Sequence, residues 1–102
     1  MPTVYITAPP EHADEIAATL VEERLAACVN RLETTSVYRW DGDVHHDDEA
    51  VLLAKTTDDA FPQLEERVLE VHPYDVPCIE RFDEADVLDS FAEWRVDNTT
   101  TE

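Results

Sequence analysis

The sequence predicts an α+β domain in which two helices cover one face of a four-stranded antiparallel sheet. Apolar patterns of β and helical type alternate in the order strand, helix, strand, strand, helix, strand. An Asp-Gly pair separates two long β-type runs, which is the strongest short-range signal for a hairpin. We find no linker, repeat or low-complexity segment, so residues 1–102 are expected to form a single domain around one core.

The first two elements are a strand and an amphipathic helix. Residues 3–8 are β-branched and aromatic, and Pro9 and Pro10 end that strand. Over residues 11–27, apolar side chains recur every three or four positions. The helical stripe consists of Ala13, Ile16, Ala17, Leu20, Val21 and Leu25.

The centre of the chain predicts a long hairpin. Residues 28–40 are rich in Val, Thr, Tyr and Trp, and the return strand runs from residue 43 to about 57. Asp41 and Gly42, the chain's one glycine, form the turn, because both central turn residues need positive φ. The apolar run 50–54 (AVLLA) is typical of a strand buried on both faces.

A second helix and a last strand follow the hairpin. Thr57 or Asp58 can cap the helix, and Pro73 ends it. The helical stripe consists of Phe61, Leu64, Val68 and Val71. Residues 74–82 (YDVPCIERF) are expected to form the last strand.

A short C-terminal helix is expected to carry Leu88, Phe91 and Trp94, and residues 96–102 are expected to fray.

The element order β-α-β-β-α-β is that of the ferredoxin-like sandwich, whose strand order 4-1-3-2 puts the second and fourth strands at the edges. Hairpin arms of about 13 residues would be roughly 43 Å long, too long for two helices to cover. Tyr38 and Trp40 would overhang the core, and the 50–54 run would put apolar side chains on the uncovered sheet face. We therefore expect self-association through the hairpin and the sheet edges.

The charge balance excludes some partners. Twenty-five acidic residues face seven basic ones, for a net charge of −18. Nucleic acids and anionic membranes would repel such a surface. With Lys55 as the one lysine, we hypothesise a halophilic source, where molar salt shortens the Debye length to roughly 3 Å.

Location and catalysis are inferred from what the sequence lacks. No apolar run reaches the roughly 20 residues of a membrane helix, and residues 1–10 do not resemble a signal peptide. We expect a cytoplasmic protein with reduced cysteines. With one glycine no phosphate loop is available, and neither Ser36 nor Ser90 lies in a nucleophile elbow. We expect no enzymatic activity and no organic cofactor.

Four segments together resemble the CutA divalent-cation tolerance family: ERLAACVN, SVYRWDGDV, VLLAKTT and VHPYDVPCI, at 23–30, 36–44, 51–57 and 71–79. The resemblance implies a homotrimer similar in architecture to the PII signalling proteins, and a role in tolerance of copper and other divalent ions. The chain differs from the family pattern at 33–35 and 83–87. Ile6 stands where some relatives have cysteine, so a copper site built on that thiol does not carry over.

Cys28, Cys78 and His72 are the candidate copper ligands, because thiolate and imidazole suit Cu(I). The alternative for each cysteine is an inert, buried side chain. On opposite sheet edges the two cysteines would lie about 14 Å apart, too far to share a metal within one chain. Any specific copper site is therefore expected between subunits.

Two further groups of residues are candidates. His45 and His46 lie in an acidic run, 45–49, that reads either as part of a metal site or as a solvated ribbon. The second group, by analogy with PII-like trimers, would line an intersubunit cleft for a small anion. It consists of Tyr38, Trp40, Lys55 and Tyr74. The sequence thus leaves three alternatives: a copper-binding tolerance protein, a sensor of a small anion, and a structural trimer.

Overall fold

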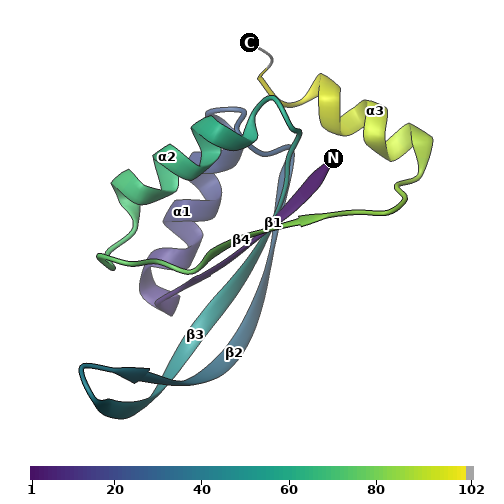
Figure 1. The fold of residues 1–102 in the computed structure, drawn as a ribbon. Helices are drawn as coiled ribbons and strands as arrows, with labels where there is room; N and C mark the ends of the chain where they lie inside the picture. Colours follow the sequence, from purple (N-terminus) through teal and green to yellow (C-terminus); the bar gives the residue numbers. More distant parts are fainter. Residues whose placement is uncertain (101–102) are drawn as a thin grey trace.

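The computed structural model describes residues 1–100, which form one antiparallel four-stranded sheet and three helices. The elements in chain order are β1 (Pro2–Ala8), α1 (Pro10–Glu22), β2 (Cys28–Trp40), β3 (Asp43–Lys55), α2 (Phe61–Val71), β4 (Ile79–Asp83) and α3 (Asp89–Asp97). Helices α1 and α2 lie together beside the sheet, and α3 lies apart from them near the N-terminus of the chain (Figure 1). Within residues 1–100 no helix has the length and apolarity needed to cross a membrane.

The sheet has the predicted topology. Its strand order is β2-β3-β1-β4, so β2 and β4 form the two edges. Lys55 at the end of β3 faces Thr3 of β1 on one side and Cys28 of β2 on the other. Since opposed residues in an antiparallel sheet point to the same face, this register fixes which side chains share the open face.

The core lies between the sheet and the two covering helices. Val4, Ile6 and Ala8 of β1 are fully buried, as are alternate residues of the 50–54 run, Ala50, Leu52 and Ala54. From the helices, Ile16, Leu20, Leu64 and Val68 complete this cluster. On the opposite face Val51 is also buried and Leu53 is half-buried, so the run is shielded on both faces, as predicted.

The hairpin extends well beyond the core. Asp41 and Gly42 have φ values of 51° and 83°, as the predicted turn requires. β1 pairs with β3 only over residues 50–55, so residues 34–49 form a two-stranded projection that we call the distal ribbon. The described chain is 45 Å long because of it (Figure 1). A two-stranded ribbon is marginally stable in water, which is why the expectation of self-association stands.

Helix α1 ends at Glu22, five residues before the predicted boundary. Arg24 adopts φ = 61°, its N–H donates to the Val21 carbonyl, and the Leu25 N–H donates to the Leu20 carbonyl. This pair of bonds is a Schellman motif with arginine in the position that glycine usually occupies. Leu25 misled the prediction because its buried side chain continues the apolar stripe of the helix after the backbone has left it.

The last strand is shorter than predicted, because β4 begins at Ile79 and not at residue 74. Helix α2 ends at Val71, before Pro73, as expected. Its start is fixed by Thr57, whose Oγ1 accepts from the Ala60 N–H at 3.2 Å. Residues 72–78 form a bent connection without ladder pairing, since Pro73 and Pro77 cannot donate backbone hydrogen bonds.

The expectation that residues 96–102 fray is wrong for residues 96–100, and residues 101–102 lie outside the description. Val96 and Asp97 belong to α3, Thr99 is buried, and the Thr100 N–H donates to the Arg24 carbonyl at 2.7 Å.

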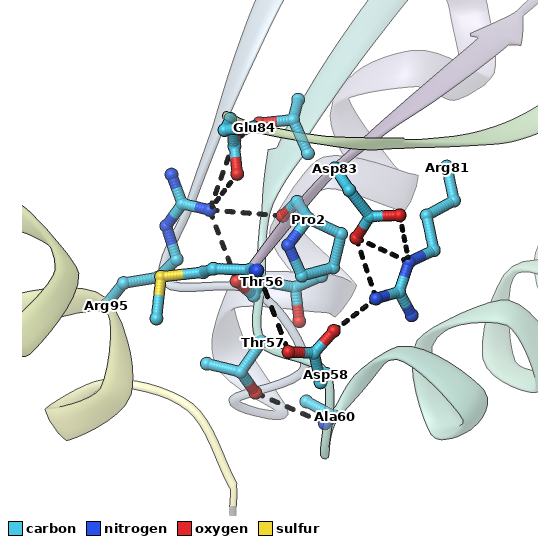
Figure 2. A network of polar contacts seen from close by, with 11 residues as sticks. Pro2, Thr56, Thr57, Asp58, Ala60, Arg81, Asp83, Glu84 and Arg95 are labelled. Atoms are coloured by element: carbon cyan, nitrogen blue, oxygen red, sulfur yellow. Dashed lines mark hydrogen bonds and ion pairs between the residues drawn. The ribbon is translucent and has the colours of Figure 1, made fainter. Parts of the chain in front are cut away.

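The start of β1 and the residues around α3 are joined by Arg95, which is 2% exposed. Its Nη1 donates to the carbonyls of Pro2 and Thr56 and to the Glu84 carboxylate (Figure 2). This buried ion pair anchors a helix that packs little against the rest of the chain.

Candidate ligand groove and metal-ligating residues

A groove of about 690 Å³ lies between the sheet, the distal ribbon and the 72–78 connection. That volume is within the range of small-molecule sites. The lining residues are Tyr5, Thr7, Ser36, Val37, Tyr38, Trp40, Glu49, Pro73, Tyr74, Asp75, Val76, Cys78 and Glu80. Three of the four predicted cleft residues, Tyr38, Trp40 and Tyr74, are therefore brought together in a single chain.

Tyr74 is held in the groove by a buried carboxylate. Its hydroxyl donates to Glu49 Oε2 at 3.2 Å, and Glu49 is only 6% exposed. Burial raises the pKa of Tyr74 to about 12, with a further contribution from the negative charge of Glu49. Tyr74 thus stays a neutral donor over the whole physiological range.

On the distal ribbon, Tyr38 is held in a similar way. Its hydroxyl donates to Asp47, and this hydrogen bond is the main reason why the pKa of Tyr38 is raised. The Tyr38 ring stacks on His45 at 5.4 Å between centroids. Trp40 lies two residues further along β2 and is half exposed. The ribbon therefore presents two aromatic side chains to the groove.

The groove is acidic. Glu49, Asp75 and Glu80 line it, and none of its described lining residues is Lys or Arg. Lys55, the fourth predicted cleft residue, lies at the far end of β3 between Thr3 and Cys28 and does not line the groove. In the single chain, the charge of the groove is opposite to what an anionic ligand requires.

His72 is an anchor for the loop that carries Tyr74. The Tyr74 N–H donates to His72 Nδ1 at 3.1 Å, so the proton is on Nε2, which donates to the Thr7 carbonyl at 2.8 Å. The side chain is buried and its ring lies 5.0 Å from that of Tyr74. Both ring nitrogens are therefore engaged, and a metal would have to displace one of these bonds.

The two cysteines lie where the strand order predicts. Cys28 begins the edge strand β2, and Cys78 precedes β4 at the opposite edge, with β3 and β1 between them. Both are free thiols of intermediate exposure. Burial and the nearby Glu80, whose Oε1 accepts from Cys78 Sγ at 3.4 Å, raise the pKa of Cys78, so its thiol is protonated at neutral pH.

His45 and His46 are exposed on the distal ribbon, facing Tyr38 and Val37 respectively. They point to opposite faces, as the alternation of a strand requires. Within residues 1–100 no three His, Cys, Asp or Glu side chains are grouped so that they could hold a metal ion. The metal-ligating candidates are thus dispersed in the single chain.

Sequence reasoning missed two important acidic and basic groups. Glu49 belongs to the acidic run 45–49, for which the sequence offered a metal site or a solvated ribbon, yet strand alternation puts it on the face of Val51. Arg95 lies four positions after Phe91, which lies three positions after Leu88, so it has the spacing of a residue in the apolar stripe. A charge at such a position signals a buried ion pair.

The strand order, the long ribbon and the terminal helix define a ferredoxin-like α+β protein of PII-like type, and one similar solved structure is described as the "PII-like protein CutA" of Nostoc. The model of the CutA1 divalent ion tolerance protein family matches residues 2–98. The chain belongs to this family, as the four sequence segments indicated.

The similarity to known relatives covers nearly the whole chain. The divalent-cation tolerance protein CutA of Thermus thermophilus is 51% identical over 98 residues, which are 94% of this chain and 95% of the relative. The Pyrococcus horikoshii CutA is 41% identical over 97 residues, with the same coverage. The solved Thermus structure superposes with a TM-score of 0.92 at 50% identity, covering 98% of this chain and all of that one. The Nostoc structure gives 0.96 at 31% identity over both whole chains.

Proposed function

We propose that this protein is a cytoplasmic, copper-binding divalent-cation tolerance protein that acts as a homotrimer by binding and not by catalysis. The observation that carries the proposal is the position of the two free thiols on opposite edges of one sheet. When copies of a chain form a closed ring, opposite edges of neighbouring copies meet. Cys28 of one copy would then approach Cys78 of the next, giving two soft ligands for Cu(I).

The distal ribbon supports the proposed assembly. No third strand of the described chain, residues 1–100, pairs with it, and three of its large apolar side chains, Val37, Trp40 and Val44, are about half exposed or more. Sister copies would cover these side chains and the unpaired backbone of β2. Sedimentation in KCl is expected to give three times the chain mass of 11.6 kDa. A well-folded single chain at micromolar concentration would contradict the assembly.

The metal proposal is tested by titrating Cu(I) anaerobically against a chelating competitor. Replacing Cys28 and Cys78 by serine is expected to lower the affinity at least about a hundredfold, because loss of thiolate ligands leaves only weak carboxylate sites. The matched control is His45→Gln with His46→Gln, which removes two exposed imidazoles and leaves the edges intact. Unchanged Cu(I) affinity after replacement of Cys28, Cys78 and His72 together would refute the proposal.

A second candidate function, sensing of a small ligand, is favoured by the groove that contains Tyr38, Trp40 and Tyr74. For the anionic ligand considered from the sequence, the positive charge would have to come from a neighbouring subunit, for instance from the Lys55 side chain of a sister copy. A thermal-shift screen of metabolites, with the assembled protein, tests this candidate. A set of anions that leaves the melting temperature unchanged would count against it.

A further inference from the structure

We propose that helix α3 is an interface element of the homotrimer, and that a sister copy of the chain covers the apolar underside of its first turns. This inference rests on the assembly given under the proposed function and does not depend on copper binding. It starts from three properties of α3: an apolar face that is buried at one end only, a position beyond a sheet edge, and polar anchors that hold the helix in place.

One face of α3 changes from buried to exposed along its length. Leu88, the N-cap residue, and Arg95 are seven positions apart, so they lie on the same face about two turns from each other. Arg95 is 2% exposed, Phe91 between them is half-buried, and Leu88 is 74% exposed. The C-terminal half of α3 therefore rests on its own chain, and the N-terminal half overhangs it with an apolar underside.

The opposite side of α3 is polar. Asp89, Glu93 and Asp97 are exposed and lie four residues apart, on the side turned away from Arg95. The ring of Trp94 stacks on that of Phe91 at 5.5 Å between centroids, so an aromatic pair borders the underside. A helix with one charged side and one apolar side needs a partner on the apolar side alone. The partner is thus expected beneath the overhang.

The overhang lies at the edge of the sheet that the assembly joins to a sister copy. The edge strand β4 ends at Asp83, and only residues 84–88 separate it from α3. In Figure 1, β4 and the chain after it lead away from α1 and α2, and α3 lies beyond them. In the proposed ring the β2 edge of a sister copy meets β4. The same sister copy therefore borders the space beneath α3.

Polar anchors fix the overhang before assembly. Arg95 Nη1 donates to the Pro2 carbonyl at 3.1 Å, and the Thr100 N–H donates to the Arg24 carbonyl at 2.7 Å. Arg24 Nη2 in turn donates to the Asp97 carbonyl at 2.8 Å. Hydrogen bonds are directional, so they orient the helix without covering its apolar underside. A surface that is already ordered loses less conformational entropy on binding.

Thiol accessibility in the assembled protein tests the inference. Leu88→Cys and the control Leu69→Cys are each made with Cys28 and Cys78 replaced by serine, and are treated with the uncharged reagent 4,4′-dithiodipyridine. Leu69 on α2 is 55% exposed, less than Leu88, so the single chain would react faster at position 88. We expect the reverse in the trimer, with Leu88→Cys reacting at least roughly tenfold more slowly once each rate is divided by its rate in urea.

Sedimentation of the same samples separates the two ways of failing. A trimer in which Leu88→Cys reacts as fast as Leu69→Cys would overturn the role of α3 and leave the assembly standing. A single folded chain of 11.6 kDa would overturn the assembly and this inference together. Protection in the purified protein also excludes a foreign partner as the cover, because the sister copies are then the only other chains present.

Subunit exchange shows whether the covered residue holds the trimer together. Preparations labelled with ¹⁴N and ¹⁵N are mixed and followed by native mass spectrometry. Leu88→Asp is expected to exchange subunits at least roughly tenfold faster than the unaltered protein, because it replaces a buried apolar side chain by a charge. Leu69→Asp, the matched control on α2, is expected to exchange at the unaltered rate. Equal exchange rates for Leu88→Asp and the unaltered protein would contradict an interface at α3.

Discussion

Replacing Arg95 by methionine is expected to destabilise the protein by about 3 kcal/mol, because it removes one member of a buried ion pair. Arg95 Nη1 lies 3.3 Å from both Glu84 carboxylate oxygens, 3.1 Å from the Pro2 carbonyl and 3.3 Å from the Thr56 carbonyl. Figure 2 shows these contacts. A methionine side chain has a similar length and offers no donor to any of them.

The magnitude follows from what each acceptor retains. Loss of one partner of a buried pair costs about 3–5 kcal/mol when the other charge is stranded. Here Glu84 is 24% exposed and keeps the Thr3 hydroxyl as a donor, and the Pro2 carbonyl keeps the Thr56 N–H. The Thr56 carbonyl loses its Arg95 donor without such a replacement. The cost is therefore expected at the lower end of that range.

The assay is urea unfolding followed by circular dichroism at fixed KCl and fixed chain concentration, because an oligomer's stability depends on concentration. Arg81→Met is the matched control. Arg81 pairs with Asp58 and Asp83 at the surface, and such pairs contribute about 0–1 kcal/mol. A double-mutant cycle with Glu84→Gln is expected to give a coupling of about 2 kcal/mol. A coupling below about 0.5 kcal/mol would refute the reasoning.

Three further predictions concern the hydroxyl of Tyr74, the turn and the surface charge. The pKa of Tyr74, raised from 10.0 to about 12, favours the neutral form of this side chain in the folded protein. Its contribution to stability is therefore complete below pH 10 and is lost as the pH rises through about 12. In a titration followed by absorbance at 295 nm, one tyrosine should ionise after the others, and this last step should be missing in Tyr74→Phe. Gly42→Ala is expected to lower the free energy of unfolding in urea by about 1 kcal/mol. The cause would be the backbone angle φ = 83° alone, since no described atom lies within 4 Å of a Cβ at this position. Gly42→Asn should lower it less, because asparagine tolerates positive φ better. The melting temperature should rise as KCl increases toward molar concentrations, because screening relieves the repulsion of a net charge of −18; a fall would contradict the halophilic hypothesis.

The sequence predicted correctly those parts of the fold where the local backbone preferences and the pattern of buried side chains indicate the same element. The Asp41-Gly42 turn set the register of β2 and β3, and the start of β2 and the turn were placed correctly. The end of α1 was misplaced because Leu25 stays in the core after Arg24 has turned the backbone. The start of β4 was misplaced because residues 74–78 have β-type side chains but no partner strand within residues 1–100.

The site was predictable only in part, for a related reason. Tyr38, Trp40 and Tyr74 could be grouped by analogy, because strand order and the ribbon determine roughly where they lie. Lys55 lies apart from them in the single chain, since its register places it beside Thr3 and Cys28, and its place in an intersubunit cleft stays a prediction. Glu49 could not be separated from its acidic neighbours by composition, because burial depends on the loop that folds over it.

Cys78 connects the two candidate functions, since it is a candidate copper ligand and also lines the groove. Its raised pKa means that the thiol is neutral before metal arrives. When Cu(I) is held by two thiolates, from Cys78 and from Cys28 of a neighbouring copy, its single positive charge neutralises only one of them, so the site becomes more negative. Copper loading is therefore expected to weaken the binding of a small anion in the same groove. Linkage then requires the anion to lower the Cu(I) affinity by the same factor, which competition titrations of the assembled protein would measure.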